Sequence, residues 1–317
     1  MQAEPLITWS EPVRELAGFI GLFLGAGAVG FRYASVRRRL AAVTPSDQAD
    51  VWADAARRAA VLGLVGWLIR AVLTAINLPA AAARQHTTVS ALASGNLQTQ
   101  VQLILLLVAL TGFALAAAGR GIGWPLAAVG VIVGQLRGVF FGPLARLVNP
   151  VHALAAGLWI GTLFVLVVAG IGAVLRHERG RGRRGTLVAE MVNGFSPLAL
   201  ASGIGVVIFG VITAWRHLPK IDALWTTPYG WALIAKLVFV AMVFALGAWN
   251  WRRQRPTLGS ESAADAIRRS AIAELSVAGV VLVVTAILIS LPAPPRPKNP
   301  GAGPGGGGPP PAAQPGK

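Results

Sequence analysis

Eight apolar segments, separated by short polar stretches, follow one another along the chain. Each is close to the roughly 20 residues with which an α-helix crosses about 30 Å of hydrocarbon. Their predicted bounds are 15–34, 59–78, 101–119, 123–143, 152–175, 195–215, 229–250 and 270–291. The pattern predicts an all-α, polytopic membrane protein with eight transmembrane helices surrounded by a lipid bilayer. Because only three residues separate the third segment from the fourth, we expect these two to form a helical hairpin.

The basic residues predict how these helices are oriented. Sixteen Lys and Arg residues fall in the gaps 36–58, 176–186 and 251–269 and in the turn at Arg120, whereas the opposite side of the membrane, tail included, has eight. Short loops rich in Lys and Arg stay in the cytoplasm. We therefore expect a multi-pass protein of the cell (inner) membrane with both termini outside. The same bias accounts for the net charge of +16 without a nucleic-acid partner.

Composition narrows the possible chemistry. The chain has no cysteine, so disulfides, thiolate metal ligands and covalent haem attachment are not expected. Neither a Ser/His/Asp set nor a nucleotide-binding loop occurs among the motifs, and the glycines fall mostly in the predicted helices or in the tail. We therefore do not expect an enzyme.

Three cations interrupt the apolar segments at depth. Arg70 lies near the middle of the second segment, Arg137 in the outer third of the fourth, and Lys236 below the outer end of the seventh. An unpaired charge at such depth costs at least about 2.5 kcal/mol, so these side chains are expected to face the bundle interior. Arg137 could equally well bind backbone carbonyls or extend to the interface, whereas for Arg70 and Lys236 we favour an internal role.

The acidic residues do not match these cations in depth. Glu274 enters the membrane with the eighth segment, about 6 Å from its inner end by helical rise. A direct pair with Lys236 is therefore not expected. Glu274 is closer in level to Asn250, Arg252 and Arg32, which favours a structural ion pair or helix clamp near the cytoplasmic side. Glu15 is a possible partner for Lys236 or Arg137.

Three of the four histidines are expected at the outer face. His86 lies in the external loop 79–100, His152 begins the fifth segment, and His217 ends the sixth. Imidazole is a good ligand for copper and zinc, and three together could form a metal site. The alternative is that they are interfacial anchors with no shared ligand. His177 lies in a basic run on the cytoplasmic side and is expected to be solvated.

The second half of the chain contains a series of short motifs. In chain order these are His152 with Gly157-Leu158-Trp159-Ile160-Gly161, Phe195-Ser196, Thr226-Thr227-Pro228-Tyr229-Gly230 with Lys236, Asn250, Arg268-Arg269-Ser270 with Glu274, and Leu291-Pro292. Their order and spacing resemble those of the copper resistance D family. The resemblance covers about residues 152–293. It divides the chain into an N-terminal four-helix half (1–151), a four-helix domain similar to that family (152–293) and a Pro/Gly-rich tail (294–317), expected to be disordered.

The resemblance implies an inner-membrane copper-handling protein, for copper transport, import or resistance, with copper as its ion. It also implies a periplasmic copper-binding partner. On this basis His152 is a ligand or gate at the outer mouth, and Tyr229, Lys236 and Glu274 are motif residues. The metal-ligating candidates are therefore His152, His217 and His86.

Two other functions compete with copper handling. An intramembrane haem or quinone protein would use the histidines as axial ligands and the buried cations for an anionic cofactor. A non-transport scaffold or assembly factor would instead present the outer histidines to a partner. Absorbance near the Soret region separates the haem protein from the other two.

Overall fold

The computed structural model of the 317-residue chain describes residues 9–37, 46–178, 182–218, 220–254 and 259–291. These residues form helices and turns, with no strand among them. Within this part of the chain, eight helices are long and apolar enough to cross a membrane, which confirms the predicted number of spans. The predicted tail, 294–317, lies outside the described residues.

The helices that make up the spans extend beyond the apolar segments. In chain order the elements are α1 (Ser10–Phe31), η1 (Arg32–Val36), α3 (Ser46–Arg84), α4 (Val89–Gly95), α5 (Leu97–Ala117), α6 (Gly123–Leu136), η2 (Arg137–Phe140), η3 (Leu144–Leu147), α7 (Val148–Ala156), η4 (Gly157–Gly161), α8 (Thr162–Val165), η5 (Leu166–Ile171), α9 (Gly172–His177), α10 (Arg184–His217), α11 (Ala223–Thr226), α12 (Pro228–Gln254) and α13 (Glu261–Ser290). The second span, α3, has 39 residues and is about 58 Å long. Its Ala-rich flanks continue the helix well past the apolar centre because alanine favours helix outside lipid as well.

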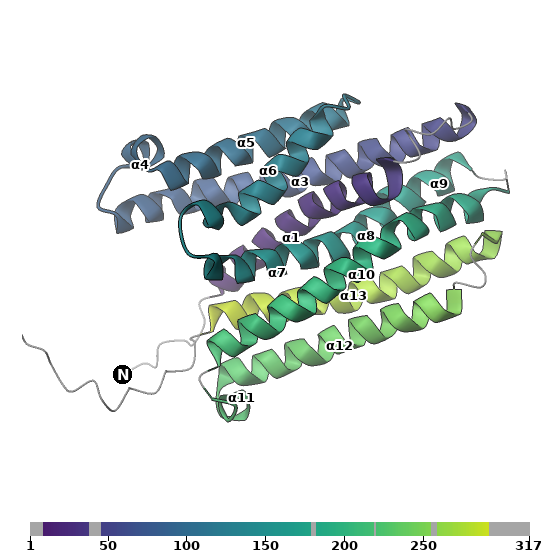
Figure 1. Cartoon of the computed structure of the whole chain (residues 1–317). Helices are drawn as coiled ribbons and strands as arrows, with labels where there is room; N and C mark the ends of the chain where they lie inside the picture. The colour runs from purple at the N-terminus through teal and green to yellow at the C-terminus, as the bar shows by residue number, and fades with distance from the viewer. Residues whose placement is uncertain (1–8, 38–45, 179–181, 219, 255–258, 292–317) are drawn as a thin grey trace, which may run out of the picture.

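The spans lie side by side as one bundle (Figure 1), with α1 between α3 and the fifth span. The α5–α6 pair forms the predicted helical hairpin and packs on α3. On the other side, α10 and α13 follow the fifth span, and α12 packs on α13. We call the end of the bundle that holds α9 and the first residues of α10 the basic end, since Arg58, Arg176, Arg184 and Arg268 lie there. The opposite end holds α4 and α11.

Glycines allow α1 to occupy this central position. A methyl group on Gly27 would overlap the backbone of Gly161 in the fifth span, and one on Gly161 would overlap the backbone of Phe23. On its other side, Gly25 contacts the indole of Trp67 in α3. Small residues of this kind let the backbones of membrane helices approach closely. As a result, the second half of α1, from Gly21 to Phe31, is buried except for the half-buried Leu24.

The fifth span is a continuous helix from Leu144 to His177 that contains two π-helical segments. Its segments η4 and η5 are π-helical, with α-helical turns between and around them. Each π-turn shifts the side chains that follow it around the helix axis. Gly161, the last residue of η4, makes the close approach to α1.

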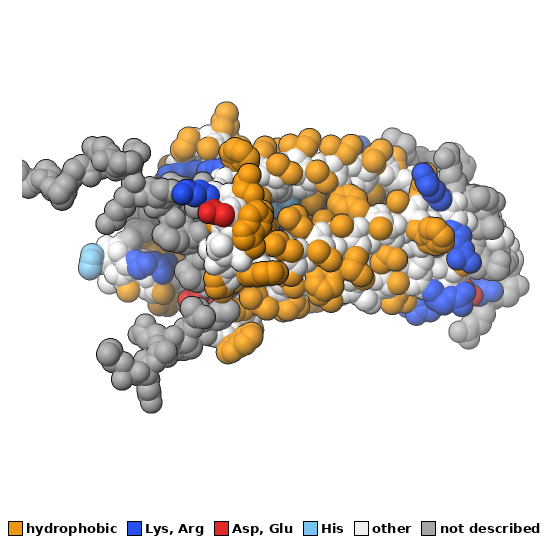
Figure 2. Space-filling model, turned by 90° about the horizontal axis from the view of Figure 1, so that it is seen from below, with side chains coloured by type: hydrophobic (Ala, Val, Ile, Leu, Met, Phe, Trp, Pro, Cys, Tyr) orange, Lys and Arg blue, Asp and Glu red, His pale blue; other side chains and the backbone are white. Residues whose placement is uncertain are grey.

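Large hydrophobic side chains cover the outside of the bundle. Leu107, Val211 and Val283 are examples that are more than 40% exposed in the isolated chain. In the view of Figure 2 they cover the middle of the molecule, while Lys and Arg gather toward its two ends. This distribution is that of a protein surrounded by lipid along its middle and by water at both ends.

Candidate functional site

His152 lies one turn inside α7, which follows the 3-10 turn η3. This α-helix begins at Val148, four residues before the predicted start of the span at residue 152. Pro150 does not stop the helix, because proline is tolerated in the first turn, where its missing N–H has no intrahelical partner. The half-buried imidazole points at α10, where its Nδ1 is 3.1 Å from the carbonyl oxygen of Val206.

This contact determines the tautomer of His152. A carbonyl oxygen can only accept, so Nδ1 donates the hydrogen, and Nε2 keeps the lone pair that a metal ion needs. The ring also needs the small residue Gly210, since a methyl group there would lie 3.0 Å from Cε1 of His152. A backbone carbonyl that holds the second nitrogen is the usual support of a metal-binding histidine.

His217 is held in the same way at the end of α10. Its Nδ1 donates to the carbonyl oxygen of Thr213 at 2.8 Å, which again leaves Nε2 free. The half-buried ring stacks on Tyr229 of α12, with centroids 6.5 Å apart and planes at 20°. Tyr229 is itself buried, in a small apolar cluster with Leu233 and Leu288.

The two imidazoles lie along one face of α10 but at different depths. Their carbonyl partners, Val206 and Thr213, are seven residues apart, which is two turns and about 10.5 Å of helix. The expected antiparallel packing does occur, and Thr213 also hydrogen bonds Asn149 of α7. The structure nevertheless does not place His152 and His217 at one level.

The fold does not bring His86 close to His152 and His217. It lies in the exposed turn between α3 and α4, with a positive φ of 51°. Figure 1 shows α4 and α11, which follows His217, on opposite sides of the same end of the bundle. Among the described residues no group of three or more His, Asp or Glu side chains is arranged to hold a metal ion.

Lys236 is half-buried on the face of α12 that carries Tyr229, two turns deeper. Its ammonium is close enough to His152 for its charge to act on the imidazole. Within the described part of the chain no carboxylate forms an ion pair with it. Glu15 is therefore not its partner. His152 of α7 and Lys236 of α12 are therefore within electrostatic range of each other.

An aromatic contact lies between these two residues and the basic end. Trp159 of η4 and Phe244 of α12 pack with ring centroids 4.5 Å apart. Phe244 also reaches α10, where it would lie 3.4 Å from a methyl group on Gly203. The two rings thus lie between the fifth, sixth and seventh spans, about two turns of α12 from Lys236 toward the basic end.

Asn250 and Glu274 meet beyond the aromatic contact, toward the basic end. Asn250 Nδ2 donates a hydrogen bond to Glu274 Oε1. Gly247, one turn earlier on α12, also lies beside the carboxylate, where a methyl group would be 3.7 Å from Oε2, an ordinary van der Waals distance. The contact joins α12 to α13, and Asn250 is one of the three residues that were expected near the level of Glu274.

The intramembrane arginines belong to the N-terminal half. Arg70 Nη1 donates to the carbonyl oxygen of Gly18 at 3.3 Å, and its guanidinium lies 5.5 Å from the centre of the Trp67 ring. Arg137 donates to the carbonyl oxygen of Gly134 at 2.7 Å and to Gln102 at 3.0 Å. Arg137 was expected either to bind backbone carbonyls or to extend to the interface, and it binds a backbone carbonyl. The hydrogen bonds of both arginines are made with residues of that half.

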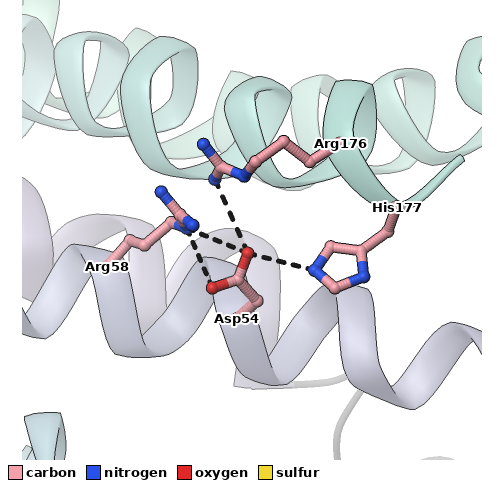
Figure 3. A network of polar contacts seen from close by, with 4 residues as sticks. All are labelled: Asp54, Arg58, Arg176 and His177. Atoms are coloured by element: carbon pink, nitrogen blue, oxygen red, sulfur yellow. Dashed lines mark hydrogen bonds and ion pairs between the residues drawn. The ribbon is translucent and has the colours of Figure 1, made fainter. Parts of the chain in front are cut away.

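A four-residue polar network at the basic end was not predicted (Figure 3). Asp54 of α3 accepts from Arg58 at 2.8 and 2.9 Å, and lies 3.5 Å from Arg176 and 3.2 Å from His177. His177 is exposed, as expected, but its Nε2 is bonded to a carboxylate rather than to water alone. Because α3 and α9 are far apart in sequence, residue spacing gave no signal for this pairing.

Comparison with known proteins shows which family and which relative this sequence is similar to. Residues 189–288 match the family described as copper resistance protein D. Over 155 residues, 48% of the chain, the sequence is 32% identical to the copper transport protein CutJ of Bacillus subtilis (strain 168). That match covers 26% of CutJ, so the chain spans about a quarter of the relative's length. No solved structure matches the chain. The copper resistance D resemblance of the motifs is thus confirmed, and its matched region contains most of α10, all of α12 and most of α13.

Proposed function

We propose that this protein handles copper in the cell (inner) membrane and transports it through its C-terminal four-helix domain, residues 152–293. The observation that carries the proposal is the position of the family match. It falls on the helices that hold His217, Tyr229, Lys236, Asn250 and Glu274, and whose carbonyl groups hold both imidazoles. Copper is the substrate of the site and imidazole is a ligand that suits it.

The two histidines would bind the ion one after the other. His217 lies at the end of α10 and His152 about 10 Å deeper, each with Nε2 free. Several weak sites in series allow an ion to enter and also to leave. A periplasmic copper-binding partner would deliver the ion to His217. His86, exposed on the far side of the same end, could take part only if its turn moves.

The route from His152 to the basic end would be controlled by two features. The charge of Lys236 would repel a cation at the His152 imidazole, and the Trp159–Phe244 contact would block the ion further toward the basic end. Asn250 and Glu274 would then offer oxygen ligands near the basic end. On this proposal, transport requires the two aromatic rings to separate.

Copper transport into liposomes tests the proposal directly. Purified protein in liposomes should move copper down an imposed gradient, and empty liposomes should not. A haem protein would instead show a Soret band as purified, and a scaffold would bind copper without moving it. Either result would exclude copper transport as the function of this protein.

The orientation can be tested independently. A reporter that is active only outside the membrane should work when fused at residue 292 and fail when fused at residue 181, because the basic gaps remain in the cytoplasm. The reverse pattern would place the histidines on the cytoplasmic side and would exclude delivery by a periplasmic partner.

Replacement of Lys236 by leucine should alter transport more than folding. The substitution removes a charge that has no acidic partner among the described residues, so the thermal unfolding temperature should stay the same or rise. We expect the copper flux to change by at least about tenfold, equivalent to about 1.4 kcal/mol. Lys220→Leu, at an exposed position near α11, is the control and should leave the flux unchanged. Wild-type flux in the Lys236 variant would mean that its charge has no part in transport.

A further inference from the structure

A groove on the side of the bundle is separate from the copper route. It lies between α1, the fifth span and α13, and its volume is about 790 Å³, within the range of about 300–1,000 Å³ that is usual for ligand sites. Its lining is almost entirely apolar and contains no histidine. The copper-route residues His152, Lys236 and Glu274 do not line it.

The groove runs along the membrane and opens to its lipid. On α13 its lining extends from Arg268 to Leu282, about 21 Å of helix. Phe164, Val168 and Ile272, which line it, are 36%, 44% and 45% exposed in the isolated chain. A hydrocarbon core of about 30 Å surrounds these residues in a bilayer, so a lipid chain has direct access to the groove.

Two guanidinium groups lie at the basic end of the groove. Arg268 is part of its lining. Arg176 folds back over Gly172, another lining residue, where its Nη2 would be 3.8 Å from a methyl group. The distance from Arg176 to Asp54 is 3.5 Å, longer than the 2.8 and 2.9 Å distances from Arg58 to Asp54. The guanidinium of Arg176 therefore has N–H donors left for another acceptor. Guanidinium groups bind phosphate with charge-assisted hydrogen bonds.

Apolar walls and a cationic end fit one kind of molecule. We propose that the groove binds an anionic phospholipid of the leaflet at the basic end, with an acyl chain along α13 and its phosphate at Arg268 and Arg176. A quinone has no charge that requires the two arginines, and a haem would need an axial ligand that the lining does not supply.

The bound lipid would fill space in the packing of three helices. α1 is the central helix and α13 carries Glu274, so the lipid would contact both the core and the helix that ends the copper route. The groove would then link the lipid composition to the stability of the bundle, because a ligand that binds only the folded state stabilises it.

Native mass spectrometry of the full-length protein in detergent micelles tests the proposal. Phosphatidylglycerol and phosphatidylcholine with identical acyl chains are added in equal amounts, and lipid retained per protein is measured. We expect wild type to retain phosphatidylglycerol preferentially. Arg268→Gln should reduce this preference about fivefold, the contribution of one cation at a membrane surface. Arg269→Gln removes the same charge from a position outside the lining and should keep the preference.

A second variant tests the groove itself. Nothing lies within 4 Å of a methyl group on Gly279, so the Cβ of Gly279→Leu has space and the rest of the side chain adds bulk to this lining position of the groove. It should fold normally and retain less of both lipids. Val280→Leu, at an exposed neighbouring position outside the lining, is the control. Equal retention of both lipids by wild type, unchanged retention in Gly279→Leu, or co-purified quinone in place of phospholipid would each overturn the proposal.

Discussion

Gly27→Ala should destabilise the whole bundle, although it adds a single methyl group. That methyl would overlap the carbonyl carbon and oxygen of Gly161, which are backbone atoms and cannot rotate away. The fifth span would have to move off α1, the helix at the centre of the fold. We expect a loss of about 3 kcal/mol in the free energy of unfolding, the upper part of the usual range for overpacking. Thermal unfolding of the purified protein in detergent measures it.

Gly18→Ala, on the same helix, provides the matched control. A methyl group at Gly18 would lie 3.8 Å from Leu73 Cδ1, an ordinary van der Waals distance. Alanine is also the better helix former by about 1 kcal/mol, so this variant should be as stable as wild type or more stable. If both variants unfold at the wild-type temperature, the close approach of α1 and the fifth span does not contribute to stability.

The number of spans followed from the sequence because the membrane imposes it. Backbone polar groups in hydrocarbon must be satisfied within the segment, so each apolar stretch of about 20 residues becomes a helix. The ends of the helices were less predictable. Hydropathy marks where a segment enters lipid, whereas α3 and α10 continue into water for as long as their residues favour helix.

The central position of α1 was not predicted, although its sequence contains a signal. The run from Gly21 to Gly30 has four glycines, a pattern typical of closely packed membrane helices. The pattern shows that neighbours are close but does not say which helices they are. In the structure α3 contacts one side of this run and the fifth span the other.

Residue counting gave approximate depths for the site but not its side-chain contacts. It placed Asn250, Arg252 and Arg32 near the level of Glu274, and Asn250 does hydrogen bond that carboxylate, although α13 begins at Glu261, nine residues before the predicted span. It predicted one level for His152 and His217, whereas their carbonyl partners Val206 and Thr213 lie two helical turns apart. The hydrogen bond between His177 and Asp54 depends on contact between α3 and α9, which no local sequence pattern predicts.

Replacing His152 and His217 together by alanine should abolish copper binding at the end of the bundle opposite the basic end. Each ring offers Nε2 as its free nitrogen, and no cysteine is available to substitute for it. Loss of a supporting group alone lowers metal affinity about 10- to 100-fold, so loss of both ligands should lower it by more than about 100-fold. The measurement is the copper-to-protein ratio after equilibration with copper and removal of excess metal.

The single variants distinguish one shared site from two successive ones. Because the carbonyl partners of the rings are two helical turns apart, His152→Ala and His217→Ala should each keep part of the bound copper. A shared site would lose all of it in either variant. His177→Ala is the matched control, since this histidine is exposed at the basic end and bonded to Asp54. A copper ratio in the double variant equal to that of wild type would exclude the imidazoles as ligands, and copper binding would then have to rest on the oxygen groups of Asn250 and Glu274, near the basic end.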